Sequence, residues 1–339
     1  MTAAVEPSGQ GAAWAGREVV VLGGAGFIGS NLALRLSSLG ATVTVVDGLI
    51  EGCGGNLANL DHAIPRERFL HLDLARQPVP DGLLSVTVVF DLMGDPAHGR
   101  SLVNPRRDLE CNLLSQIALF EALRKIRRPP LVVLASTRQV YGRAQSLPVS
   151  EDHPLAPPDP NGIHKVAAEQ YASVYGHVYG VRAILLRLTN VYGPRQGNAD
   201  PAHGVAGFLI GRLMRGEPVL LYGGGTFRRD WLYVDDAVEA LLAAGTRESA
   251  NGRVFNIGHD RPVSLREFAL KARELVGAGE VRDVPFPPEQ RVIDVGDYWT
   301  DPRRAAEQLG WRASTSLFEG LRATIEFYRS RPGGERWPP

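Results

Sequence analysis

The sequence predicts an α/β protein with a doubly wound parallel sheet and a smaller C-terminal α/β lobe. Short β-branched runs, which suit strands buried on both faces, alternate with stretches of helical periodicity. The chain has 339 residues, and 44% of them are hydrophobic. That composition is enough to bury one large core, or the cores of a large and a small lobe.

A glycine-rich turn follows the first predicted strand, Glu18–Leu22, and opens a helix that Gly40 ends. Glycines permit a tight turn and let backbone N–H groups approach a pyrophosphate at the N-terminus of the helix. Because the turn lies between a strand and a helix, it predicts a dinucleotide site. The turn residues expected to hold the cofactor are Gly23, Gly26, Phe27, Ile28 and Gly29.

The second predicted strand, Thr42–Val46, is closed by Asp47, which lies 18 residues after Gly29. This spacing suits a carboxylate that accepts hydrogen bonds from the ribose hydroxyls of adenosine. A carboxylate at this point repels a 2′-phosphate. The sequence therefore favours NAD over NADP.

Three further runs extend the predicted sheet. They are Phe69–Leu74, with Asp73 placed to meet the adenine, then Val86–Leu92, then Leu131–Ser136 after a helix from about Leu109 to Lys125. No internal repeat is evident. Strands that alternate with helices in this way favour a parallel sheet with helices on both faces.

Composition excludes several classes of protein. Lys+Arg and Asp+Glu are both 37, so no net charge calls for nucleic acid or an acidic membrane. No apolar run reaches the roughly 18 residues of a membrane span. The two cysteines, Cys53 and Cys111, do not have the spacing of zinc ligands and suit a reducing cytoplasm. We expect no metal, a cytoplasmic protein, a disordered tail over residues 1–16 and a second tail over 331–339.

Six sequence blocks agree in order and spacing with one known family. They begin at Gly23, Ala135, Lys165, Arg187, Tyr222 and Asp301. The chain resembles the NAD-dependent epimerase/dehydratase family, the extended short-chain dehydrogenases, from about Arg17 to Tyr328. The resemblance implies an NAD-binding Rossmann domain over 17–187. It also implies a mainly substrate-binding lobe over 188–330, with return crossings to the sheet.

The same resemblance implies the ligands. NAD is expected as the cofactor, and the residues that would complete its site are Asp73, Leu74, Met93, Asn112 and Lys165. The partner is expected to be a nucleoside diphosphate sugar, linked to UDP or dTDP. The residues that would bind it are Asn190, Arg229, Arg291 and Tyr222. Forked guanidinium donors and an amide suit a diphosphate.

The catalytic positions depart from the family pattern at one residue. By resemblance, Thr137 bonds the sugar oxygen and Lys165 binds the nicotinamide ribose. The position four residues before Lys165 belongs to a proton-carrying tyrosine in the family, but here it is Asn161. An amide cannot carry a proton near neutral pH. His164 and His98 are the candidate replacements, and for each the alternative is an ordinary hydrogen-bonding histidine.

The neighbours of Thr137 narrow the reaction. Family 4,6-dehydratases carry Asp-Glu directly after this threonine, and sugar-acid decarboxylases carry Glu two residues after it. This chain has Arg138 and Gln139, which cannot serve as the acid and base of an elimination. An epimerase, which needs hydride removal, rotation and hydride return, therefore fits best. The alternatives are another modification of a nucleotide sugar, by a dehydratase, decarboxylase or reductase, or a non-catalytic protein that binds both ligands.

The resemblance also implies a homodimer. In similar proteins, the helices that correspond to Leu109–Lys125 and Ile163–Val178 pair across a two-fold axis. The apolar positions Leu109, Leu113, Ile117 and Phe120 are consistent with a buried face, although packing on the protein's own sheet would give the same pattern.

Overall fold

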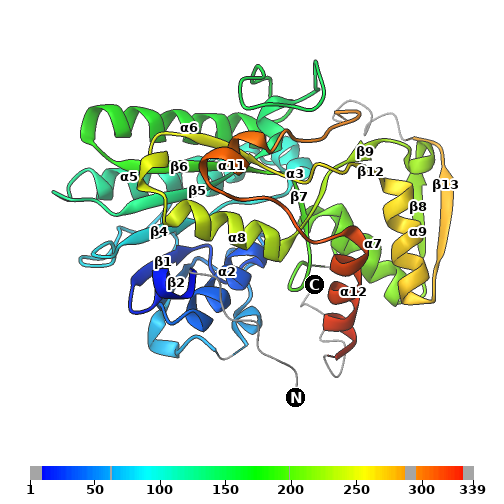
Figure 1. Ribbon diagram of the computed structural model, residues 1–339, viewed down its shortest axis with the longest axis horizontal. Coiled ribbons are helices and arrows are strands. Elements are labelled where there is room, and N and C mark those ends of the chain that lie inside the picture. Colours follow the sequence, from blue (N-terminus) through cyan, green and yellow to red (C-terminus); the bar gives the residue numbers. More distant parts are fainter. Residues whose placement is uncertain (1–9, 62, 198, 287–294, 331–339) are drawn as a thin grey trace.

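The computed structural model describes residues 10–61, 63–197, 199–286 and 295–330. Within these ranges, seven strands form one parallel sheet in the order β3-β2-β1-β4-β5-β6-β11 (Figure 1). Their bounds are β1 (Glu18–Leu22), β2 (Thr42–Asp47), β3 (Phe69–His71), β4 (Val88–Asp91), β5 (Leu131–Thr137), β6 (Arg182–Leu188) and β11 (Val254–Ile257). The predicted doubly wound α/β class is confirmed.

Helices cover both faces of this sheet. On one face, α2 (Phe27–Ser38) and α8 (Val234–Gly245) pack side by side on the apolar residues of β1, β4 and β5. On the other face lie α5 (Ser115–Leu123) and α6 (Pro160–Tyr179). Strand order reverses between β1 and β4, which leaves a crevice at the carboxyl ends of these strands.

A second lobe stands beside the carboxyl edge of the sheet, on the right of Figure 1. Its helices α7 (Val205–Met214), α9 (Leu265–Val276) and α12 (Leu317–Ser330) enclose a separate apolar core. One strand pair, β8 (Pro218–Tyr222) with β13 (Glu280–Val284), flanks that core. The remaining short elements are β7 (Asn190–Tyr192), β9 (Arg228–Arg229), β10 (Trp231–Tyr233), β12 (Val263–Ser264) and α11 (Arg303–Gln308).

The helix predicted over Leu109–Lys125 is not continuous. Helix α3 (His98–Val103) is followed by α4 (Pro105–Leu109), a π-helical turn over Glu110–Leu114, and then α5. The Asn104 side chain caps α4 by accepting from the Arg107 N–H at 3.1 Å. Single π turns inside helices occur mostly at functional sites. This one carries Cys111 and the buried Asn112 toward the crevice.

The prediction of a disordered tail over residues 1–16 does not hold for its last part. Residues Gln10–Trp14 form helix α1, and the Trp14 side chain is fully buried. Its ring packs on Phe90, with ring centroids 5.7 Å apart. The pattern of apolar periodicity missed this helix because one large side chain, rather than a face, anchors it. Residues 331–339, predicted as a tail, lie outside the described residues.

Two shorter differences have local causes. Strand β3 ends at His71 rather than at Leu74, and Asp73 then accepts from the Ala75 N–H at 3.0 Å in a turn. Helix α6 begins at Pro160, three residues before the predicted start, because Asp159 caps it. None of the helices in the described ranges is long and apolar enough to span a membrane.

Candidate active site

Two adjoining cavities occupy the crevice at the carboxyl ends of β1, β2, β4 and β5. The larger one has a volume of about 440 Å³ and reaches the second lobe, and the smaller one, of about 80 Å³, lies toward Asp47. Both cavities are bounded by Gly23, Gly26, Cys53, Leu92, Met93 and Gly94. A long ligand can therefore pass from one into the other.

The glycine turn at the start of α2 packs too closely against the protein backbone to admit side chains. Gly23 has a φ of +69°, and a Cβ there would lie 2.6 Å from the Leu92 carbonyl oxygen. A Cβ on Gly29 would lie 2.2 Å from the Gly23 carbonyl oxygen. Gly26 caps the helix and has no side chain to occupy the first-turn N–H groups. The predicted turn residues, Phe27 and Ile28 included, line the larger cavity and fit a pyrophosphate.

Asp47 is fixed by the turn that it faces. Its Oδ2 accepts from the Ala25 N–H at 3.0 Å and its Oδ1 from the Leu49 N–H at 2.8 Å. Burial raises the pKa of this carboxyl, and those two hydrogen bonds oppose the rise. Asp47, Asp73 and Leu74 all line the smaller cavity, as an adenosine site requires.

The predicted nicotinamide end is built around Gly94. Lys165 Nζ donates to the Met93 carbonyl at 3.1 Å, and a Cβ on Gly94 would lie 3.0 Å from that nitrogen. Burial lowers the pKa of Lys165, while the charge of Asp91 opposes the shift. Asn112 Nδ2 donates to the Asp95 carbonyl at 3.3 Å. Its buried Oδ1 accepts no hydrogen bond from any described residue, so a bound ligand could donate to it.

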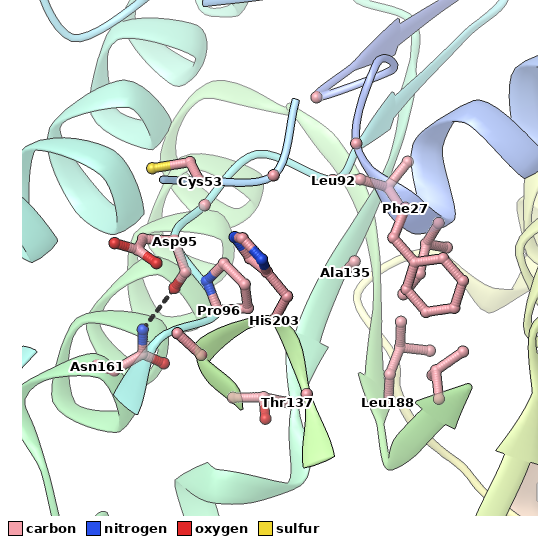
Figure 2. Close-up of a pocket in the computed structure, with 18 of the residues that line it drawn as sticks. Phe27, Cys53, Leu92, Asp95, Pro96, Ala135, Thr137, Asn161, Leu188 and His203 are labelled. Carbon is pink, nitrogen blue, oxygen red and sulfur yellow. Dashed lines mark hydrogen bonds between the residues drawn. The ribbon is translucent and has the colours of Figure 1, made fainter. Parts of the chain in front are cut away.

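Asn161 is buried, and its side-chain amide is used in structural hydrogen bonds. Nδ2 donates to the Asp95 carbonyl at 2.7 Å (Figure 2). It also donates to Asp108 Oδ2 at 3.0 Å. Thr137, at the end of β5, lines the same cavity and accepts from the Gln139 N–H at 3.2 Å. Asn161 therefore ties the loop after β4 to the start of α6 within the catalytic region.

His98 lies in the larger cavity beside a buried carboxylate. Its Nδ1 is 3.1 Å from Asp159 Oδ2, and its side chain is about one-third exposed. Asp159 Oδ1 accepts from the Gly162 N–H at 2.8 Å, and Oδ2 accepts from Gln139 Nε2 at 3.0 Å. Burial alone would raise the pKa of Asp159, but His98 and these two donors lower it overall. The imidazole thus lies beside a fixed, ionised carboxylate.

His164 occupies a different environment. Its Nδ1 is 2.6 Å from Asp108 Oδ1, and the side chain is mostly buried on α6. Asp108 therefore bridges His164 and Asn161, one oxygen to each. His164 is not among the residues that line either cavity.

The predicted diphosphate residues are only partly brought together. Asn190 lines the larger cavity, and its Nδ2 donates to the Asp230 carbonyl at 3.1 Å. Arg229 donates to the backbone carbonyls of Arg228 and Gly296, and the Tyr222 ring packs on Phe286. Neither Arg229 nor Tyr222 lines the cavity. Arg291 lies outside the described residues.

Sequence reasoning missed several residues that shape the site. Asp159 was detectable, because an Asp-Pro pair before a helical run is typical of an N-cap followed by Pro at the first helical position. Asp108 and His203 carried no local signal, because each meets the site through a contact distant in sequence, and Gln196 lines the larger cavity beside His203. No cluster of three or more metal-ligating side chains occurs in the described part of the chain.

Comparison with known proteins identifies the family. The model of the NAD dependent epimerase/dehydratase family matches residues 19–258. The chain belongs to this family. A UDP-glucose 4-epimerase of Mycolicibacterium smegmatis is 34% identical in an alignment of 318 residues that covers 92% of this chain and 98% of the relative. A dTDP-glucose 4,6-dehydratase of Actinoplanes is 33% identical in an alignment of 325 residues that covers 92% of this chain and 98% of the relative.

Solved structures agree with this assignment. The structure of UDP-glucose 4-epimerase with UDP-glucose from Thermotoga maritima is 31% identical, covers 92% of this chain and 98% of its own, and has a TM-score of 0.82. The protein is therefore an NAD-dependent enzyme of the epimerase/dehydratase type. The glycine turn, Asp47 and the unpartnered Asn112 Oδ1 fit that cofactor.

Asp47 provides the test of the cofactor assignment. The Asp47→Asn variant is expected to bind NAD more weakly by about 1.5–3 kcal/mol, the scale of a hydrogen bond to a charged group. Its NADP affinity should fall less, because the carboxylate also repels the 2′-phosphate. Isothermal titration of both cofactors with parent and variant measures the two changes. Tighter binding of NADP than of NAD by the parent would contradict the assignment.

Proposed function

We propose that this enzyme is an epimerase that inverts one carbon of a nucleoside diphosphate sugar, most similar to the 4-epimerases. The observation that carries this proposal is the His98–Asp159 pair in a cavity that also contains Thr137 and Lys165. Epimerisation by transient oxidation needs one reversible proton carrier, and this pair supplies one. UDP- or dTDP-linked sugars are the proposed substrates, in line with the relatives.

The residues after Thr137 support epimerisation over elimination. The Arg138 guanidinium lies over the Tyr298 ring, 4.9 Å from its centroid, and does not line the cavity. The Gln139 amide is buried and donates to Asp159. Neither group can act as the acid or the base that loss of water requires.

His98 is the proposed proton carrier. Bound NAD supplies the acceptor for a hydride from the sugar carbon. As the bond between this carbon and its hydrogen breaks, the imidazole takes the proton of the hydroxyl group on the same carbon. Thr137 holds the oxygen of that hydroxyl group. Asp159 Oδ2 lies 3.1 Å from Nδ1, so its charge would stabilise the imidazolium, and Nε2 is the nitrogen that we propose faces the substrate. After the keto sugar turns over, the hydride returns from the bound cofactor to the opposite face of the carbon, the same proton returns to the oxygen, and the other epimer forms.

Asn161 has a positioning role in this scheme. Its amide holds the Asp95 carbonyl, and Asp95 Oδ1 in turn accepts from the Ala97 N–H at 2.9 Å, directly before His98. An amide needs no ionisation for this task, and its two donors have fixed, buried acceptors. The proton passes through His98, which directly follows this loop, and not through Asn161.

The reaction is tested by product analysis with a panel of UDP- and dTDP-sugars. The expected product has the mass of its substrate and an inverted centre, with no net change in absorbance at 340 nm. A product lighter by one water, or by carbon dioxide, would instead identify a dehydratase or a decarboxylase. Binding of both ligands without turnover would identify a non-catalytic protein.

The proton carrier is tested by a matched pair of histidine variants. His98→Gln is expected to lower kcat by about 10²–10⁴-fold, the scale of general acid–base catalysis. His164→Gln is the matched control, because His164 is also held by a carboxylate but does not line the cavity. The kcat of this variant should fall less than about tenfold. Turnover of both variants decides the matter, with thermal unfolding as a check on folding. Full activity of His98→Gln would remove this residue from the mechanism.

We also propose that two copies pair through α6. The exposed side chains of Ile163, Tyr171, Val174 and Val178 share one stripe of this helix. An apolar stripe of this kind suits burial against a second copy. The parent is expected to have the mass of a dimer by light scattering at micromolar concentration. Val174→Glu with Val178→Glu should give a monomer, and a monomeric parent would reject the interface.

A further inference from the structure

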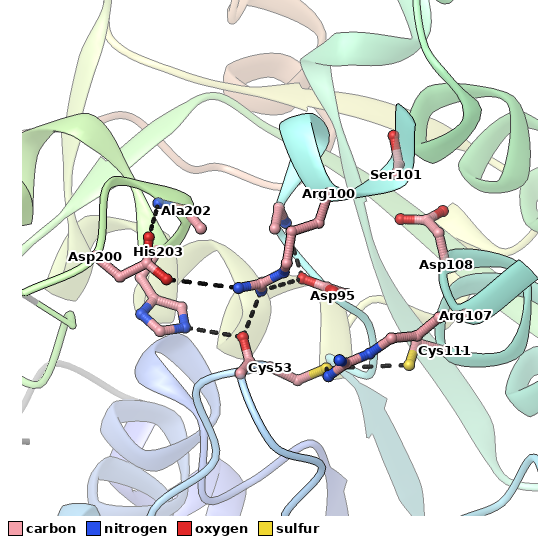
Figure 3. Close-up of polar contacts among 12 residues, drawn as sticks. Cys53, Asp95, Arg100, Ser101, Arg107, Asp108, Cys111, Asp200, Ala202 and His203 are labelled. Carbon is pink, nitrogen blue, oxygen red and sulfur yellow. Dashed lines mark hydrogen bonds and ion pairs between the residues drawn. The ribbon is translucent and has the colours of Figure 1, made fainter. Parts of the chain in front are cut away.

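The only two cysteines of the chain lie side by side at the cofactor cavities. Cys53 belongs to the loop after β2, and Cys111 belongs to the π-helical turn before α5. Their Sγ atoms are 4.0 Å apart (Figure 3). The two thiols are 58 residues apart in sequence, so the fold, rather than a local motif, brings them together.

The two sulfurs differ in access. Cys53 is half-buried and lines both cavities, whereas Cys111 is buried behind it and lines the smaller cavity. A guanidinium nitrogen of Arg107 lies 3.8 Å from the Cys53 sulfur. The hydrogen bond between the thiols lowers the pKa of Cys111 and raises the pKa of Cys53, and burial raises both. Cys111 also lines a third cavity that Cys53 does not line, so a reagent can approach the pair from either side.

The loop that carries Cys53 is held over the cofactor site by polar contacts. Arg107 donates to the Glu51 carbonyl, and Arg100 donates to the Gly52 carbonyl. A ring nitrogen of His203 lies 3.0 Å from the same Gly52 oxygen. These contacts come from α3, α4 and the loop before α7. The loop thus bridges the sheet and the second lobe across the mouth of the site.

The loop also touches the glycine turn itself. The Asn56 N–H donates to the Ala25 carbonyl at 3.0 Å, and Asp47, which begins the loop, accepts from the Ala25 N–H. Residues 48–56 therefore lie beside the turn along which a dinucleotide would bind. The same loop meets the turn Glu110–Leu114 through the two sulfurs.

We propose that Cys53 and Cys111 are a redox site, and that the disulfide between them locks loop 48–56 over the bound dinucleotide. This inference rests on the cofactor site assigned above, not on the proposed epimerase reaction. The covalent bond would join the loop to the turn Glu110–Leu114 at a point that both cavities share. Oxidation then slows exchange of the cofactor, and reduction restores it.

The chemistry is an ordinary thiol–disulfide exchange with a small disulfide such as oxidised glutathione. One cysteine of the pair, as its thiolate, attacks one glutathione sulfur, and the other glutathione leaves as a thiolate. The second cysteine then loses its proton and attacks the protein sulfur of the mixed disulfide, and the second glutathione leaves. Two protein thiols are oxidised, one glutathione disulfide is reduced, and the two protons go to the released glutathione thiolates. A shift of about 2 Å brings the sulfurs to bonding distance.

The first experiment counts thiols in the full-length protein after treatment with oxidised glutathione. Unfolding with an alkylating agent and mass spectrometry should show a monomeric chain that has lost two hydrogen atoms and takes up no alkyl group. Dithiothreitol should restore two alkylatable thiols. Cys111→Ser should instead retain glutathione on Cys53. A stable glutathione adduct in the parent, or a disulfide between two chains, would overturn the proposal.

The second experiment measures the rate at which bound NAD exchanges with isotopically labelled NAD, before and after oxidation. The oxidised parent should exchange at least about tenfold more slowly, because a cross-link removes the open conformations of the loop. Cys53→Ser, compared with itself, should show no effect of the oxidant. An intramolecular disulfide with an unchanged exchange rate would overturn the lock. Neither readout depends on turnover, so both stand whichever sugar reaction the enzyme performs.

Discussion

The site depends on the hydrogen bonds of one buried amide. Asn161 Nδ2 holds the Asp95 carbonyl and Asp108 together, and so joins the loop after β4 to the first turn of α6. The Asp95 carbonyl also accepts from Asn112, which faces the cofactor cavity. One backbone oxygen therefore fixes the loop before His98 and the side chain of Asn112. Loss of a buried donor here would leave that oxygen and the Asp108 carboxylate short of partners, which costs free energy.

Most residues of the family's site are present in this chain, and the proposed mechanism differs from the family pattern in the proton carrier. The glycine turn and Asp47 suit the dinucleotide, and Thr137 and Lys165 lie in the same cavity. The cap of α6 places Asp159 beside His98, while Gln139, at a position used for catalysis by dehydratases, supports Asp159 instead. In the proposed mechanism, Asp159 and Gln139 orient the imidazole, although neither carries the proton.

Local sequence patterns predicted the sheet, the glycine turn and Asp47, because each depends on short-range periodicity or on a fixed spacing. They did not predict the contacts of Asn161, which lie 66 and 53 residues away in the chain. Position along α6 made His164 a neighbour of Asn161, but only the fold shows that Asp108 holds both. Helix α1 was missed because a single tryptophan anchors it, and the π turn at Glu110–Leu114 interrupts an otherwise regular helical pattern.

The central claim is that Asn161 holds the loop and that the proton passes elsewhere. It is tested most directly by the turnover of Asn161→Tyr on the substrate that the product panel identifies. If the claim is correct, the phenol gives no gain and lowers kcat, because it displaces the amide from Asp95 and Asp108. If the chain has simply lost the family's proton carrier, the tyrosine should raise kcat by about 10²-fold or more. A gain of that size would contradict the account.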